Sequence, residues 1–499
     1  MRHPKGSYIL GIDQSTQGTK ALIFDAGGKI LARSDLPHGQ IINDKGWVEH
    51  NLMEIYYNTL QVARDVVQKA GIDRSLVAAV GISNQRETAG AWDRATGEPV
   101  CNAVVWQCAR GEEICRRLEK DGAANVVKNR TGLKLSPYFS AAKWSWILEH
   151  VPGVREKAER GGLCCGTIDS WLVYRLTGGK EFRTDYSNAS RTQLFNILTL
   201  KWDEKLCRGF KVPSQCLPEV TDSNGFFGET DFDGFFEKPV PICGVLGDSH
   251  GALFGHGCHE RGMTKATYGT GSSVMMNIGE SPVMSPDVVT SLGWSADGRV
   301  VYVLEGNINY TGAVITWLRD SLGLISSPWE TEFLAREANP EDRTYLVPAF
   351  TGLGAPYWNT KARASLLGMS RTTGKREIVK AALDCIAYQI TDLIQTMEEA
   401  SGIQERELWV DGGPTKNEYL MQFQSDVLGI PVKVPEAEEL SGIGAAYMAG
   451  IRAGLYDWEE IFKGHMTSCF QPKAKPEDMA ELYMGWKEAV AKTLAGKSR

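Results

Sequence analysis

The chain has 499 residues, more than one hydrophobic core usually supports, so its length predicts two domains. Its 54 lysine and arginine residues against 61 aspartate and glutamate residues give a formal net charge of −7, without the basic block of a nucleic-acid or membrane-binding surface. No apolar run approaches the roughly 20 residues of a membrane helix, and the eleven cysteines show no C-x-x-C spacing. We therefore expect a cytoplasmic protein with reduced thiols and a small soluble ligand, with no nucleic-acid or membrane partner.

The first recognisable element is a hairpin. Two strand-like apolar runs, at residues 8–12 and 21–24, flank a polar segment that predicts a tight turn. The turn is rich in hydroxyl groups, and Gly18 permits close backbone approach, which suits phosphate oxygens. Asp13, at the end of the first strand, is placed to hold the Mg²⁺ that accompanies phosphates. On this stretch alone, an ordinary polar hairpin is favoured over a nucleotide loop, because short motifs often match by chance.

Further along the first half, residues 30–34 return as a third strand, which predicts an antiparallel meander. Residues 53–70 carry apolar positions at helical spacing. The continuous apolar run at 77–82 predicts a strand covered on both faces, and the polar residues 83–88 follow it where functional groups tend to collect. Additional strands are expected at 89–92 and 104–106, and additional helices at 114–118 and 141–148.

The chain changes character after Pro239. Residues 240–246 have a buried-strand pattern that ends at Gly247 and Asp248, and a helix is expected to begin near Gly251. We expect the domain junction near residue 254, which divides the chain into 1–254 and 255–499.

The second half repeats the opening pattern. Residues 264–277 again run from a strand through a Gly/Thr/Ser turn to a strand, so the two halves look like versions of one plan. Beyond it we expect a helix at 377–400, a strand at 408–411, a turn at 412–417, and helices at 419–428 and 442–453 packed beside that strand.

Three turn-rich segments follow predicted strands, at residues 13–20, 268–273 and 411–417. Together they indicate a nucleotide gripped between two domains, with two turns for phosphates and one Gly-Gly turn where a base and ribose can approach the backbone. The sequence has neither a P-loop nor a Gly-x-Gly-x-x-Gly motif after a strand, which excludes the two commonest nucleotide scaffolds.

Seven longer stretches and two signatures then identify a family. The stretches are GWVEH at 46–50, NQRET at 84–88, VWQC at 105–108, PYFS at 137–140, TDYSNASRT at 184–192, PAFTGLGAPYW at 348–358 and MQFQSD at 421–426, and the signatures cover 138–150 and 364–384. With these motifs the chain resembles the FGGY family of carbohydrate kinases, and within it the glycerol kinases over nearly the whole length. The resemblance implies an α/β fold of two actin-like (ribonuclease H-like) domains around a central cleft, with the polyol site mainly on the first and the ATP site mainly on the second.

The resemblance also implies a polyol site. It makes Asp248 the general base, with Arg86, Glu87, Trp106 and Tyr138 shaping the pocket. Phosphoryl transfer to an alcohol needs in-line positioning, charge neutralisation and one carboxylate to accept the hydroxyl proton, which agrees with these residue types. From the residues alone, alternatives remain: a helix-capping carboxylate at 248, a solvated ion pair at 86 and 87, and core packing for the two aromatic rings.

Two positions of the implied substrate site depart from the glycerol kinase pattern. Ser249 stands where those enzymes carry glutamine, and Ser273 stands where they carry an aromatic residue. Both changes enlarge the substrate site and add hydroxyl groups. We therefore expect ATP-dependent phosphorylation of glycerol or a closely related small polyol, with a four- or five-carbon polyol or ketose as the alternative. A non-sugar actin-like ATPase is the alternative from another class.

The same resemblance places the nucleotide. The implied ATP-binding residues are Thr16, Gln17, Gly18, Lys20, Thr270, Gly312, Gly413 and Asn417, with Asp13 for Mg²⁺. Lys20 replaces the arginine usual in glycerol kinases, so a guanidinium becomes a more localised ammonium. Gly312 is also explained as a helix-packing glycine.

The sequence also contains a possible zinc site as an alternative to the kinase site. Five residues that could ligate zinc lie close together in the sequence, although their spacing fits no familiar finger. They are Cys243, His250, His256, Cys258 and His259. We expect the enzyme to be a homo-oligomer, either a dimer or a tetramer.

Overall fold

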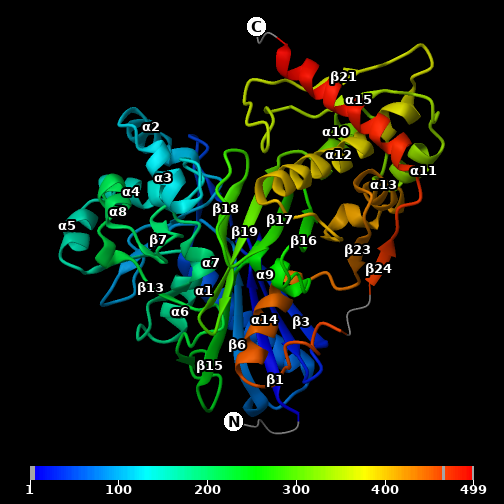
Figure 1. The fold of residues 1–499 in the computed structure, drawn as a ribbon. Helices are drawn as coiled ribbons and strands as arrows, with labels where there is room; N and C mark the ends of the chain where they lie inside the picture. The colour runs from blue at the N-terminus through cyan, green and yellow to red at the C-terminus, as the bar shows by residue number, and fades with distance from the viewer. Residues whose placement is uncertain (1–5, 464–466, 497–499) are drawn as a thin grey trace.

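A computed structural model describes residues 6–463 and 467–496 (Figure 1). The first half of the chain builds a six-stranded sheet with the order β14-β15-β6-β1-β2-β3. Its strands are β1 (Tyr8–Gln14), β2 (Gly18–Phe24), β3 (Ile30–Pro37), β6 (Val77–Asn84), β14 (Glu229–Thr230) and β15 (Val240–Gly247). β1, β2 and β3 are antiparallel neighbours, while β1, β6 and β15 run parallel, which confirms the predicted meander and the buried strand beside it.

The second half builds a seven-stranded sheet with the order β18-β19-β17-β16-β22-β23-β24. Its strands are β16 (Thr264–Tyr268), β17 (Ser272–Gly279), β18 (Val289–Ala296), β19 (Arg299–Ile308), β22 (Leu408–Asp411), β23 (Val432–Pro435) and β24 (Thr467–Phe470). The hairpin β16–β17 beside the parallel strands β22 and β23 matches β1–β2 beside β6 and β15. The repeated plan expected from the sequence is therefore confirmed.

The helices cover these sheets and build an additional group beside the first one (Figure 1). They are α1 (Leu52–Ala70), α2 (Glu112–Lys120), α3 (Ala124–Thr131), α4 (Ser140–His150), α5 (Val154–Glu159), α6 (Ile168–Leu176), α7 (Tyr186–Ala189), α8 (Glu204–Phe210), α9 (Asp248–Gly255), α10 (Gly312–Asp320), α11 (Glu330–Arg336), α12 (Lys375–Ser401), α13 (Glu418–Leu428), α14 (Leu440–Arg452) and α15 (Pro476–Ala495). Short strands are β4 (Ile41–Ile42), β5 (Val48–His50), β7 (Gly90–Asp93), β8 (Ala103–Val104), β9 (Leu163–Gly166), β10 (Arg183–Asp185), β11 (Phe195–Asn196), β12 (Lys201–Trp202), β13 (Glu219–Thr221), β20 (Tyr345–Val347) and β21 (Ser365–Leu367). The strand expected at 104–106 ends at Val104.

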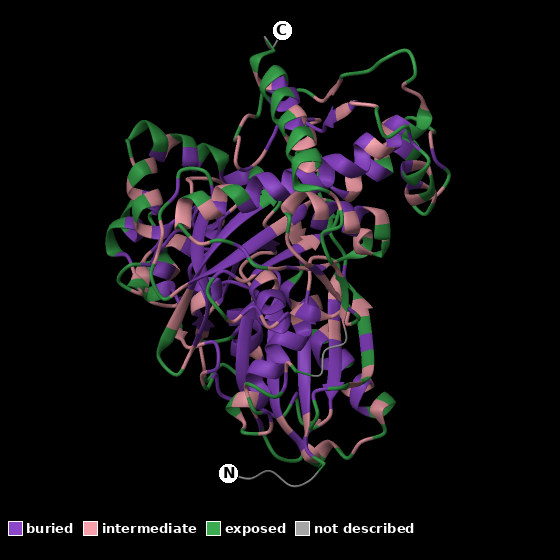
Figure 2. Ribbon diagram, turned by 45° about the vertical axis from the view of Figure 1, so that its right-hand side comes forward, coloured by how far each residue is buried: buried purple, intermediate pink, exposed green. Residues whose placement is uncertain are grey.

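The first sheet is covered on both faces, as its apolar strands predict (Figure 2). Side chains alternate across a strand, so Leu10 and Ile12 pack with α1 and α6, while Ile9 packs with α14. A Cβ atom at Gly81 would lie 2.2 Å from the backbone oxygen of Ala445. Glycine at this position therefore lets α14 lie directly against the middle of the sheet.

Helix α14 packs on the sheet of the other half of the chain, where it meets α9. α14 follows β23 of the second sheet, yet it packs on β6, β15 and β1 of the first. The prediction that residues 442–453 pack beside the strand at 408–411 is therefore wrong. Small residues explain the packing: a Cβ at Gly444 would lie 1.9 Å from the Gly251 oxygen, so α9 and α14 meet through their backbones. These helices, far apart in sequence, lie side by side at the centre of Figure 1.

In the described part of the chain, none of the helices combines the length and the apolar character needed to cross a bilayer. The eleven cysteines are all free thiols, and most of them are buried.

Candidate active site

Asp248 lies directly after β15, as the first residue of α9. Its Oδ1 atom accepts hydrogen bonds from Nε of Arg86 at 3.1 Å and from the Ser249 backbone at 2.6 Å. Among the described residues, none donates a hydrogen bond to Oδ2, and the side chain is 37% exposed. The helix begins three residues earlier than predicted, so the carboxylate also occupies the favourable first turn of a helix. Asp248 thus presents one anchored oxygen and one open oxygen.

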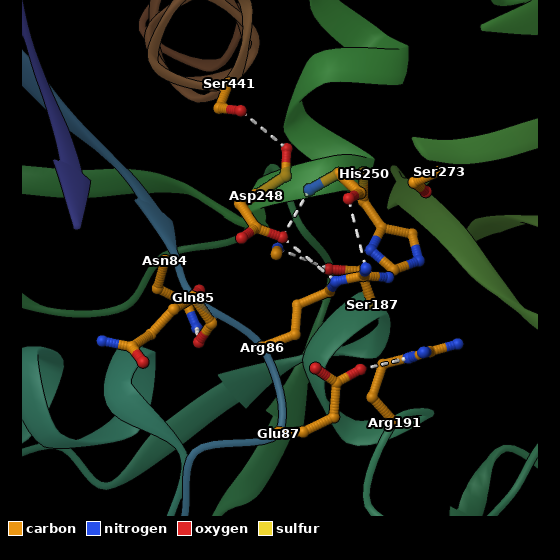
Figure 3. Close-up of polar contacts among 12 residues, drawn as sticks. Asn84, Gln85, Arg86, Glu87, Ser187, Arg191, Asp248, His250, Ser273 and Ser441 are labelled. Atoms are coloured by element: carbon orange, nitrogen blue, oxygen red, sulfur yellow. Dashed lines mark hydrogen bonds and ion pairs between the residues drawn. The ribbon is translucent and has the colours of Figure 1, made fainter. Parts of the chain in front are cut away.

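Arg86 and Glu87 are both buried, so the alternative of a solvated surface pair is wrong. The Arg86 guanidinium donates to both oxygens of Glu305, at 3.0 and 3.2 Å. Glu87 accepts a 2.6 Å hydrogen bond from Nε of Arg191, and Arg191 also reaches Glu305 at 2.7 Å. Figure 3 shows Arg86 extending toward Asp248 while Glu87 turns toward Arg191. The predicted pair belongs to a continuous buried ion network.

The sequence prediction missed Glu305 and Arg191, although Glu305 carries a signal. Glu305 is the single acidic residue in β19, within an otherwise largely apolar strand (RVVYVLEGNI). A lone buried charge in such a strand requires a partner. Burial raises the pKa of Glu305, but the guanidinium groups of Arg191 and Arg86 more than offset it and hold that pKa well below its usual range. Glu305 is therefore ionised in the folded protein.

Both substrate-site departures from the glycerol kinase pattern, Ser249 and Ser273, lie beside this network. The Ser249 hydroxyl accepts a 3.1 Å hydrogen bond from Arg86. The Ser273 hydroxyl lies 3.5 Å from Oε1 of Glu305, at the long limit of a hydrogen bond. The structure therefore brings these two serines together with Arg86 and Asp248, as the substrate-site prediction requires.

Trp106 and Tyr138 meet edge to face, with 5.5 Å between their ring centroids. Both rings are half-buried, so neither is a fully enclosed core residue. The Trp106 indole nitrogen donates a 2.9 Å hydrogen bond to the hydroxyl of Thr16. Thr16, expected to contact ATP, thereby joins the first turn to the aromatic pair. Lys143, fully buried, fixes the backbone at Tyr138 through hydrogen bonds to the carbonyl groups of residues 137–139.

Asp13 is the penultimate residue of β1 and pairs with Lys20 of β2. Its carboxylate is buried and lies 3.9 Å from Nζ of Lys20, which itself bonds more closely to Glu439 at 2.8 Å. Burial, opposed by Lys20 and reinforced by the Glu439 and Asp248 charges, raises the pKa of Asp13 to about 6. In the described residues no three side chains form a ready-made metal cage. Asp13 therefore offers one carboxylate, to which other ligands must be added.

Two further residues of the first turn, Gln17 and Gly18, differ in their surroundings. Gln17 is exposed, and its backbone oxygen accepts a 3.2 Å hydrogen bond from His38. A Cβ atom at Gly18 would lie 2.5 Å from the Leu36 oxygen, so packing against β3 already requires glycine there.

A pocket of about 370 Å³ lies between α10, α11, α12 and the turn after β22. It is lined by Gly312, Ile315, Thr316, Pro328, Trp329, Thr331, Glu332, Leu383, Ile386, Gly413, Pro414, Lys416, Asn417 and Leu420. It thus contains the three residues predicted for the nucleoside: Gly312, Gly413 and Asn417. Its walls are mainly apolar, as a flat base requires.

Thr270 does not line this pocket but is bonded to the start of α10, which does. Its backbone oxygen accepts hydrogen bonds from Thr311 and Ala313, both at 3.0 Å, at the start of α10. A Cβ atom at Gly312 would lie 2.7 Å from the Gly269 oxygen, so Gly312 serves helix packing as well as lining the pocket.

The five Cys and His residues considered for zinc are not brought together. His256 bonds to Asp411 at 2.7 Å, His250 lies 3.4 Å from the Ser291 hydroxyl, and His259 packs among aromatic rings. Since no metal-binding group is present in the described part of the chain, the zinc alternative has no support.

Comparison with known proteins agrees with this arrangement. The model of the FGGY family of carbohydrate kinases, N-terminal domain, matches residues 8–255, and that of the C-terminal domain matches residues 264–453. The chain is 46% identical over 490 residues to a glycerol kinase of Alkaliphilus oremlandii, covering 98% of this chain and 97% of the relative. It is 47% identical to glycerol kinase 1 of Thermotoga maritima, covering 98% and 99%.

Solved structures give the same result. The structure is similar to that of Plasmodium falciparum glycerol kinase with ADP, with a TM-score of 0.93, 33% identity and 99% coverage of both chains. Gluconate kinase from Lactobacillus acidophilus shares the fold at 22% identity, with a TM-score of 0.88 and coverage of 98% and 99%. These likenesses confirm the predicted two-domain actin-like α/β fold. This chain belongs to the FGGY family of carbohydrate kinases.

Proposed function

We propose that this kinase transfers the γ-phosphoryl group of ATP to a hydroxyl of glycerol or a closely related small polyol. The open Oδ2 atom of Asp248, on a carboxylate anchored by Arg86, carries the proposal because it can receive the proton of the attacking hydroxyl. The relatives with 46% and 47% identity are named glycerol kinases, which supports the choice of acceptor.

In this mechanism Asp248 is the general base. Arg86 and the Ser249 backbone hold Oδ1, which fixes the direction in which Oδ2 points. A positioned base of this kind contributes roughly 10²–10⁴ in rate. Most of the remaining acceleration in phosphoryl transfer comes from alignment and charge neutralisation.

The polyol lies against Arg86, Glu87, Trp106 and Tyr138 in this proposal. The carboxylates accept hydrogen bonds from polyol hydroxyls. The edge-to-face aromatic pair covers the C–H groups, and its fixed geometry limits the length of the chain that enters.

ATP is proposed to place its base in the apolar pocket beside Gly312, Gly413 and Asn417. The phosphates then extend toward the two hairpin turns, with Thr16, Gln17, Gly18 and Lys20 on one and Thr270 on the other. Lys20 shares its charge with Glu439, so the ammonium is already held in place before nucleotide binds.

Asp13 is the residue proposed for Mg²⁺. Its buried carboxylate has a raised pKa and only a distant cationic neighbour, so a divalent cation would relieve the cost of burying its charge. Mg²⁺ is commonly held by one or two carboxylates together with water and substrate phosphates, which fits a site with a single protein carboxylate. When bound, the ion neutralises phosphate charge during transfer.

We further propose that 1–254 and 255–499 act as separate lobes, with the polyol mainly on the first and ATP mainly on the second. The α9–α14 contact joins them. Closure excludes water, which would otherwise compete with the alcohol. A cytoplasmic location and a dimeric or tetrameric assembly remain part of the proposal, and sedimentation analysis measures the latter.

A four- or five-carbon polyol or ketose is the second candidate substrate. Ser249 and Ser273, two short side chains beside Arg86 and Glu305, favour it because they leave space and offer hydroxyl groups. Steady-state rates with ATP and glycerol, erythritol, threitol, xylulose and ribulose distinguish the candidates. A kcat/KM that is highest for glycerol supports the first, and a higher value for a longer acceptor supports the second.

A further inference from the structure

Glu305 connects the two halves of the site. It belongs to β19 of the second sheet, and its side chain is 1% exposed. Its two partners come from the first half of the chain: Arg86 follows β6, and Arg191 follows α7. Arg86 uses both terminal nitrogens on Glu305, at 3.0 and 3.2 Å, and turns only Nε toward Asp248.

The way in which Arg86 shares its hydrogen-bond donors between Glu305 and Asp248 affects the chemistry at Asp248. Arginine and carboxylate prefer a bidentate pairing that occupies both carboxylate oxygens. Because Glu305 already holds the terminal nitrogens of Arg86, Asp248 receives a single hydrogen bond from this arginine, and its Oδ2 stays open. Glu305 also balances the positive charge of Arg86.

The cluster has one carboxylate more than it has guanidinium groups. Glu87, Asp248 and Glu305 face Arg86 and Arg191. Removing the charge of Glu305 would therefore leave Arg86 with only Asp248 as a directly bonded carboxylate.

Other charged groups also act on this region. Asp13 on β1 repels Asp248, and Lys265 on β16 interacts with Asp248, Glu305 and Arg86. Ser441 of α14 donates to the Asp248 backbone oxygen and adds no charge to the side chain. Burial and the neighbouring Arg86 lower the pKa of His250, which stays neutral behind Arg86. Among these groups, only Glu305 forms a bidentate pair with Arg86.

We propose that Glu305 is a positioning residue for phosphoryl transfer, which holds Arg86 away from bidentate pairing with Asp248 and so keeps Oδ2 of Asp248 open to accept a proton. The inference rests on the proposed role of Asp248 as base. Glu305 itself does not contact the acceptor. A purely structural role would stabilise the fold without changing the pH dependence of phosphoryl transfer.

The test compares Glu305→Gln and Glu305→Asp with the wild-type kinase over a pH series, using ATP, Mg²⁺ and the best acceptor from the substrate panel. In Glu305→Gln we expect kcat to fall about tenfold or more, because Arg86 occupies Asp248 more fully. The acid limb of the kcat/KM profile should also move about one pH unit lower, because the uncompensated Arg86 charge favours the ionised base. Glu305→Asp keeps the charge and should lie between the two proteins.

Asp392→Asn is the matched control. Asp392 is a buried carboxylate of the second half, and its partners Tyr357, Tyr483, Trp486 and Lys487 lie at or near α15, apart from the Arg86 network. This variant should lose thermal stability while its acid limb stays at the wild-type pH.

Three results would overturn the proposal. In folded Glu305→Gln, either an unchanged kcat and acid limb or a lower kcat with the acid limb at the wild-type pH would contradict it. The same kcat and acid limb in Glu305→Gln and Glu305→Asp would also contradict it. If Glu305→Gln does not fold, the Glu305→Asp variant is used instead. The acid limb of its kcat/KM profile should move in the same direction by a smaller amount. An acid limb at the wild-type pH in Glu305→Asp would contradict the proposal. A wild-type protein that phosphorylates none of the acceptors would instead refute the proposed function.

Discussion

Nε of Arg86 donates a 3.1 Å hydrogen bond to Oδ1 of Asp248, a residue 162 positions further along the chain. The sheet register explains this contact, because Asn84 at the end of β6 pairs with Gly247 at the end of the parallel strand β15. Parallel strands present their carboxyl ends at the same edge, where functional groups gather. The two residues are therefore brought together by strand pairing.

Lysine should not be able to replace the guanidinium group of Arg86. In Arg86→Lys a single ammonium cannot bond simultaneously to Asp248, Ser249 and both oxygens of Glu305. We expect kcat/KM for the acceptor to fall by roughly 10²-fold, as for the loss of charge-assisted hydrogen bonds worth about 1.5–3 kcal/mol each. Arg74→Lys, at an exposed ion pair with Glu237, should match the wild type. Equal rates for the two variants would contradict the assignment.

Trp329 should contribute to nucleotide binding. It lines the apolar pocket yet is 71% exposed, so a stacked base would cover it. Replacing Trp329 with alanine should weaken ADP binding by about three- to tenfold in calorimetry, the equivalent of 0.5–1.5 kcal/mol for an aromatic contact. Phe333 lies one helical turn away and is 62% exposed, but it does not line the pocket. Phe333→Ala should bind ADP normally, and equal weakening of both variants would argue against the contact.

Asp13 should make the Mg²⁺ requirement depend on pH. Because its pKa is raised to about 6, the carboxyl group is mostly protonated below that pH, and a proton then competes with the cation. The Mg²⁺ concentration for half-maximal activity should therefore rise by up to about tenfold per pH unit as pH falls below about 6.

The nucleotide phosphates also take up protons as pH falls, and Asp13→Asn separates that effect from protonation of Asp13. The variant should need more Mg²⁺ at pH 7.5 and should lose the additional rise near pH 6. A wild-type Mg²⁺ requirement in Asp13→Asn would remove this residue from the ion site.

Asp169 should make the folded protein less stable as pH rises. The carboxyl group is buried next to Thr167 and Thr184, and burial, opposed by their hydroxyl hydrogen bonds, raises its pKa from 3.8 to about 7. The folded state then holds a proton that the unfolded chain has already released, so stability falls between about pH 4 and pH 7 and stays low above it.

Asp169→Asn removes this titration with little change in shape. Thermal melts at pH 5 and pH 8 should show a smaller loss of Tm in the variant than in the wild type. Asp121→Asn, at an exposed position, should behave as the wild type. If Asp169→Asn loses as much Tm as the wild type between these pH values, another group titrates.

Local patterns predicted the elements well. The hairpins β1–β2 and β16–β17, the buried strand β6 and the long helix α12 all follow from apolar spacing and turn residues. The location of α14 did not follow, because periodicity gives a helix its apolar face but not the sheet that will cover it. The close approach of Gly444 to Gly251 decides that packing, and it joins residues 193 positions apart, which single-sequence patterns do not encode.

The residues of the site were likewise predicted only in part. Asp248, Arg86 and Glu87 were predicted from strand ends and family motifs, and the structure places them in one network. Glu305 was missed because its partners lie in the other half of the chain, and only the folded structure pairs them. For the first turn, Gly18 shows that a residue typical of phosphate binding also serves backbone packing.

The most direct test of the account is phosphoryl transfer by Asp248→Asn, measured beside the wild type with ATP, Mg²⁺ and each small polyol or ketose of the panel, and with ADP binding as the check on folding. The account predicts that the wild type phosphorylates at least one of these alcohols. It also predicts that the variant binds ADP normally but transfers phosphate at least about 10²-fold more slowly. A variant that keeps the wild-type kcat, or a wild type that phosphorylates no alcohol while it binds nucleotide, would contradict it.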